Sequence, residues 1–217
     1  MDTYELVARS VMFPRWILYL LSFSIVCLSV LNYKKEVISV HMRKILFSSS
    51  SLSSFTKEET SFFGKLNWIL TLNYAITTAI ATYMLLIYYE VDHIWLISIP
   101  FLYYLLQNLS IRFSGLISGE FKKIYENLLF SSFSAHAIGI LLIPIILVWI
   151  LNPQHSNTLI PILIFSFFAI HFLRIVRGVF SALRNKVAWY YIILYICTFE
   201  IWPVLIAYLL ILPNFAE

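Results

Sequence analysis

The chain has 217 residues, of which 61% are hydrophobic, 18% aromatic and 12% charged, and its formal net charge is +4. A soluble domain carries roughly 25% charged residues, so this composition excludes a soluble enzyme, a disordered chain and a disulfide-stabilised scaffold. It predicts a single membrane-embedded domain over residues 1–217. The apolar runs are continuous rather than alternating, which favours an all-α integral membrane protein over a β-barrel.

A membrane-spanning helix needs about 20 predominantly apolar residues. Six stretches of the chain meet this requirement. They predict transmembrane helices over about residues 15–31, 66–89, 94–111, 132–151, 159–180 and 189–212. The first run ends in Leu31-Asn32-Tyr33-Lys34-Lys35 and has no small-residue cleavage site after it. We therefore expect it to stay in place as the first helix rather than to be removed as a signal peptide.

Lysine and arginine predict the orientation, because they are enriched in short cytoplasmic loops. They gather in the connections that follow the first, third and fifth predicted spans, whereas residues 90–93 and 152–157 contain neither. The residues concerned are Lys34, Lys35, Arg43, Lys44, Lys57, Lys65, Arg112, Lys122, Lys123, Arg184 and Lys186. With six spans, this alternation predicts that both termini face the periplasm.

The longest segment outside the predicted spans is the cytoplasmic segment 33–65. Its first part, residues 34–47, has apolar residues at helical spacing among basic ones, which predicts an amphipathic helix. This helix would lie either on an anionic leaflet or against the cytoplasmic face of the protein itself. Thr56 and Glu59 then form a capping-box pattern, so we expect the second long helix to begin there.

Ionisable residues inside spans are costly to bury and mark candidate functional sites. By helical rise, Glu200 lies roughly 17 Å, His171 roughly 13 Å and His136 roughly 6 Å from the cytoplasmic ends of their spans. Arg174 and Arg177 follow His171 near one helix face. These residues predict a polar cluster in the cytoplasmic half, in which Glu200 contacts His171 directly and Arg174 lies beneath the pair.

Four interpretations of this cluster stay open. It could fix the register of the helices as a satisfied polar group, or form a proton, ion or substrate path. His136 and His171 could be axial ligands of a haem, and Arg174, Arg177 and Arg184 could line a pocket for a lipid headgroup.

Other polar and small residues in the spans predict helix packing. Asn73, Gln107 and Asn108 are expected to form interhelical hydrogen bonds, and Gly115 and Gly119, four residues apart, to allow a close helix crossing.

The run Leu194–Pro203, which reads LYxCTxEIxP, resembles the hallmark of a family of multi-spanning inner-membrane proteins from Bacteroidota that is catalogued as a domain of unknown function. The stretches 171–178 and 139–144 are similar to the same family, whereas Trp202 stands where an aliphatic residue is expected. The resemblance implies a bacterial inner membrane and about six spans, and it supplies no activity. The resemblance also implies that genes of this family lie next to genes for tetrapyrrole synthesis, which keeps the haem interpretation open.

No CxxC, HExxH, P-loop or GxGxxG pattern occurs, and Cys27 and Cys197 both lie in apolar runs. We therefore predict a non-enzymatic subunit or scaffold that works through the bilayer and other membrane or envelope proteins, without a cofactor, a metal or nucleic acid. The alternative is a transporter or proton-path protein that uses Glu200, His171 and His136. A haem-binding membrane protein is the weaker alternative.

Overall fold

The computed structural model describes residues 13–34, 57–118 and 121–184, together with 189, 190, 193 and 197. These residues form helices joined by short connections, and none of them belongs to a strand, so the all-α prediction is confirmed for this part of the chain. In chain order the elements are α1 (Trp16–Lys34), α3 (Lys57–Tyr88), η2 (Ile94–Ser98), α4 (Ile99–Ser118), α5 (Phe121–Leu151), η3 (Pro153–His155) and α6 (Ser156–Arg184).

Four helical stretches in the described part are long and apolar enough to cross a membrane, which suggests a membrane protein. They are Asn67–Tyr88, Ile94–Phe113, Phe130–Leu151 and Pro153–Phe180. The predicted first span corresponds to α1, whose apolar stretch Trp16–Val30 is shorter than these four. The predicted sixth span 189–212, apart from four residues, and the amphipathic segment 35–47 lie outside the described residues.

The helices extend further than the predicted spans. α3 begins at Lys57, where the capping-box pattern predicted a helix start. α5 begins at Phe121 and α6 continues to Arg184, so both helices project beyond their apolar stretches. Most of the predicted connection 112–130 is consequently helical. Hydropathy marks where the apolar stretch ends, whereas a helix can continue into water as long as its backbone hydrogen bonds continue.

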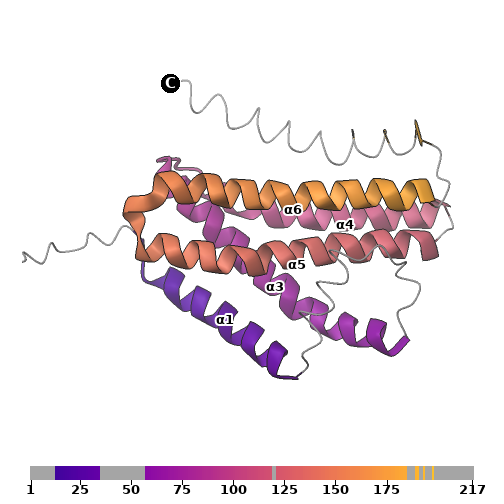
Figure 1. The fold of residues 1–217 in the computed structure, drawn as a ribbon, viewed down its shortest axis with the longest axis horizontal. Helices are drawn as coiled ribbons and strands as arrows, with labels where there is room; N and C mark the ends of the chain where they lie inside the picture. The colour runs from indigo at the N-terminus through magenta and orange to yellow at the C-terminus, as the bar shows by residue number, and fades with distance from the viewer. Residues whose placement is uncertain are drawn as a thin grey trace, which may run out of the picture.

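α5 lies at the centre of the bundle. It packs against α3, α4 and α6, while α1 packs mainly against α3. Figure 1 shows α4 and α6 running alongside α5, with α3 crossing obliquely and α1 on the side away from α6. α4 ends, α5 begins and α6 ends at the same end of the bundle. We call this end the basic end, because Arg112, Lys122, Lys123 and Arg184 belong to it.

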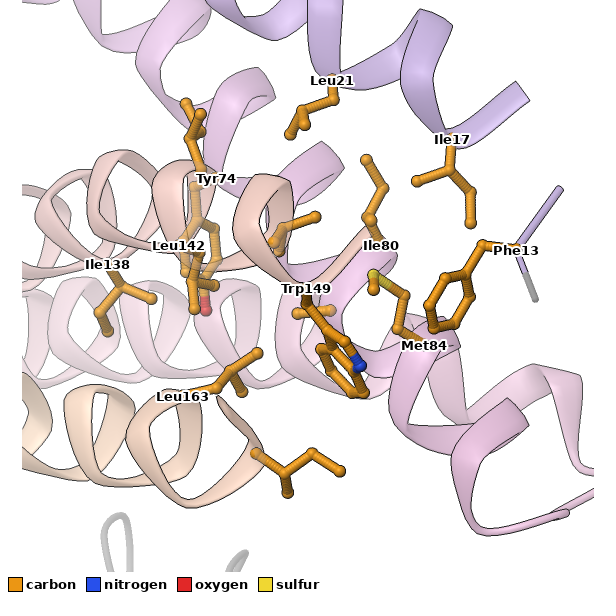
Figure 2. Packing of buried hydrophobic residues seen from close by; sticks show 14 of the residues in the cluster. Phe13, Ile17, Leu21, Tyr74, Ile80, Met84, Ile138, Leu142, Trp149 and Leu163 are labelled. Carbon is orange, nitrogen blue, oxygen red and sulfur yellow. The ribbon is translucent and has the colours of Figure 1, made fainter. Parts of the chain in front are cut away.

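The apolar core lies toward the opposite end of the bundle. Trp149 is fully buried in an apolar cluster that includes Phe13, which precedes α1, and Met84 of α3 (Figure 2). The Phe13 ring meets the indole edge-on, with 5.9 Å between the ring centroids. The indole N–H donates a hydrogen bond to Ser156 Oγ at 3.0 Å, so the polar atom of this large side chain is satisfied at the start of α6.

Candidate functional site

Four polar residues connect α4 to α6, and a fifth, Arg177, follows them on α6 toward the basic end. Tyr103 and Gln107 are one turn apart on α4, and His171, Arg174 and Arg177 follow one another at about one-turn intervals on α6. We call these five residues the α4–α6 seam. The Tyr103 hydroxyl lies 3.1 Å from His171 Nε2, and the Arg174 guanidinium donates a hydrogen bond to Gln107 Oε1. The two helices are thus connected at successive turns.

α5 takes part in the same arrangement. The Ser131 hydroxyl donates to Gln107 Oε1 at 3.4 Å, so this carbonyl oxygen is a point where α4, α5 and α6 meet. One turn nearer the basic end, the Arg177 guanidinium lies over the Phe130 ring, with 5.5 Å between Cζ and the ring centroid. Such a cation–π contact keeps a cationic group next to an apolar surface.

The seam is made by side chains more than by close backbone packing. α4 and α6 each pack mainly against α5 rather than against each other. Gln107 is buried, whereas Tyr103, His171, Arg174 and Arg177 are half-buried. The His171 ring also stacks on Phe167, with 6.2 Å between centroids and 6° between planes. Hydrogen bonds between membrane helices contribute about 0.6 kcal/mol on average, so the seam is a set of modest links that together define register.

His136 lies on a different face of the bundle. Its ring is 2% exposed, and its Nε2 lies 3.3 Å from Thr71 Oγ1 of α3. No described group lies within hydrogen-bond distance of His136 Nδ1. The contacts of His136 are therefore with α3, whereas those of His171 are with α4. Each Nε2 atom lies beside a hydroxyl group of a different helix.

A third polar contact joins α1, α3 and α5. Asn73 is 2% exposed and accepts a hydrogen bond from the Ser24 hydroxyl of α1. Its amide also lies beside Gly139 of α5. Asn108, by contrast, donates to the Tyr104 carbonyl of its own helix at 3.1 Å. Asn73 and Gln107 therefore make interhelical hydrogen bonds, whereas the hydrogen bond that Asn108 donates stays within α4.

The other residues that the sequence singles out lie near the end of α4 or outside the described residues. Gly115 lies in the last part of α4, and Gly119 lies outside the described residues. Glu200 also lies outside them, so its predicted contact with His171 and Arg174 stays a prediction. Among the described residues, no group of three histidine, cysteine, aspartate or glutamate side chains is arranged to hold a metal ion.

The sequence did not predict Tyr103 and Ser131, nor Ser24 and Thr71, which contact Asn73 and His136. Tyr103 precedes Gln107 by four residues and therefore shares its helix face, a signal that could have identified it. Ser131 stands just outside the predicted fourth span, and only the tertiary structure places it beside Gln107.

Residues 16–211 match the model of a family described as Domain of unknown function (DUF4271), and the chain belongs to this family. No curated protein and no solved structure matches the chain.

Proposed function

We propose that this member of the DUF4271 family is a multi-pass protein of the bacterial inner membrane that acts as a non-catalytic subunit or scaffold of an envelope complex. The observation that supports this proposal is that polar side chains within the apolar helices contact one another. Asn73, Gln107, Arg174 and His171 each contact a polar side chain of another helix. Contacts of this kind hold helices in register, and a stable bundle with a fixed lipid-facing surface is what a membrane partner needs.

The orientation proposed with this role places the basic end in the cytoplasm. Arg112, Lys122, Lys123 and Arg184 all lie at that end, whereas the described connections at the opposite end carry Glu90 and Asp92. The bias of lysine and arginine toward cytoplasmic loops supports this assignment.

A second candidate function is a proton or ion path, and the seam is the observation that favours it. Tyr103 and His171 are half-buried, hydrogen-bonded to one another and followed by Arg174 on the same helix. Groups that can exchange protons in the membrane are a recognised feature of such paths. The two functions make opposite predictions for variants of this pair.

The experiment is complementation of a deletion strain, with the amount of each variant in the membrane measured in parallel. Tyr103→Phe and His171→Gln keep much of the side-chain volume and remove the exchangeable proton or the titratable ring. In a scaffold, complementation follows the amount of folded protein, and the abundance of the partner falls when the chain is deleted. A variant present at wild-type level that fails to complement would contradict the scaffold and support the path.

The control is Tyr19→Phe. Tyr19 is 74% exposed on α1, away from the seam, so the loss of its hydroxyl should leave abundance and complementation unchanged in either case.

A further inference from the structure

We propose that the α4–α6 seam binds the headgroup of an anionic membrane lipid, with Arg177 as its main phosphate contact and Arg174 beneath it. The site would take a phosphodiester lipid such as phosphatidylglycerol, whose acyl chains lie along the apolar surfaces of α4 and α6. The inference adds a ligand to the protein and does not depend on the scaffold role.

The first observation is the depth of Arg174 and Arg177 relative to the end of the apolar stretch of α6. The apolar stretch of α6 ends at Phe180. At 1.5 Å per residue, Arg177 lies about 4.5 Å and Arg174 about 9 Å inside that boundary. A long side chain extends along its helix toward the interface, so the Arg177 guanidinium comes within reach of the phosphate level. Arg174 is directed to Gln107 and lies deeper.

The second observation is charge. The described cationic side chains near the basic end are Arg112, Arg174 and Arg177. The acidic side chains that the structure describes are Glu90 and Asp92, both in the connection between α3 and η2 at the opposite end. In the sequence, residues 112–130 and 174–186 contain seven basic residues and two acidic ones, Glu120 and Glu126, so positive charge predominates there. The attraction between a phosphate and these cations is stronger where the dielectric constant is lower than that of water. An arginine side chain has five N–H donors, so one guanidinium can serve a protein acceptor and a phosphate together.

The third observation is the apolar surface beside the seam. Leu106 of α4 and Leu173 and Phe180 of α6 are each within about one turn of a seam residue, and they are 54%, 48% and 68% exposed. Arg177 itself lies over the Phe130 ring, which holds the cation against an apolar surface. A ligand that matches this pattern has an anionic head and long apolar chains. Basic sites between membrane helices on the cytoplasmic side bind such headgroups.

The test uses the purified full-length chain in a mild detergent. Phosphatidylglycerol or phosphatidylcholine with identical acyl chains is added, the melting temperature is followed by tryptophan fluorescence, and bound lipid is counted by native mass spectrometry. We expect phosphatidylglycerol to raise the melting temperature more than phosphatidylcholine does and to remain bound. The difference should diminish at high salt, because the contact is between charges.

Arg177→Gln should weaken the apparent affinity for phosphatidylglycerol about tenfold or more, as expected for the loss of a charge-assisted hydrogen bond. Arg177→Lys should retain part of the preference, because it keeps the charge. Arg15→Gln is the matched control, since Arg15 is an exposed arginine at the start of α1, at the opposite end of the bundle.

Three results would overturn the proposal. The first is an equal effect of the two lipids on the wild-type chain, and the second is an Arg177→Gln variant that keeps the full preference. The third is that glycerol phosphate, which has no acyl chains, raises the melting temperature as much as phosphatidylglycerol does. The site would then bind a free anion rather than a lipid. If the wild-type chain shows no preference for phosphatidylglycerol and the Glu200→Gln variant does, then the Glu200 carboxylate occupies the site that we assign to the lipid phosphate.

Discussion

Gly139 of α5 lies against the backbone of Tyr74 of α3 so closely that a Cβ atom at position 139 would be 2.9 Å from Tyr74 Cα. The same Cβ would also be 3.1 Å from Asn73 Nδ2. Backbone atoms cannot rotate away as a flexible side chain can, so glycine is required for the two helices to approach this closely. This contact gives a physical role to Gly139, the first residue of the stretch 139–144 that is similar to the family.

Gly139→Ala should therefore lower the free energy of unfolding by about 1–3 kcal/mol, the usual cost of overpacking a well-packed core. The measurement is the melting temperature in detergent, followed by tryptophan fluorescence. Val148→Ile is the control, because it adds one methyl group to an exposed position of the same helix. Equal stability of the glycine and alanine proteins would show that α3 and α5 are further apart than described.

The Gln107–Arg174 contact predicts coupling between the two residues. Gln107→Leu and Arg174→Leu each leave a polar partner without its interhelical bond, and each should cost about 1–3 kcal/mol. The double variant removes both polar groups, so its cost should be smaller than the sum of the single costs. A double-mutant cycle of melting temperatures measures this difference, and strict additivity would argue against the contact.

Ser156 should contribute to stability through the buried indole of Trp149. Ser156→Ala removes the acceptor of the Nε1–H bond and should cost about 1–3 kcal/mol, because the indole donor then stays buried without it. Ser166→Ala removes a hydroxyl that, among the described residues, bonds to the Ile162 carbonyl of its own helix, and a change within about 0.5 kcal/mol is expected. Thermal unfolding of both variants tests the prediction, which fails if the two substitutions have the same effect.

The predicted orientation can be tested with topology reporters. Fused after Glu217, a reporter that works only in the periplasm should be active, because six spans with a cytoplasmic basic end place the C-terminus outside. The same reporter inserted in the α4–α5 connection, next to Gly119, should be inactive. Activity at the second site with none at the first would reverse the proposed orientation.

Some features of this protein follow from its sequence alone. The membrane class and the helical fold follow from composition and from long continuous apolar runs, because backbone groups in a bilayer must be satisfied within each helix. The start of α3 at Lys57 was also predicted, since a capping box is a local signal between residues three apart.

Which polar side chains contact one another, in contrast, depends on the tertiary structure. Sequence spacing gave the depths of His136 and His171 and suggested one cluster, but depth does not tell which way a side chain points around the helix axis. The rotation of α5 directs His136 toward Thr71 of α3, and the rotation of α6 directs His171 toward Tyr103 of α4. Helix rotation in a membrane is set by packing against neighbouring helices, and that packing depends on long-range contacts such as the one between Gly139 and Tyr74.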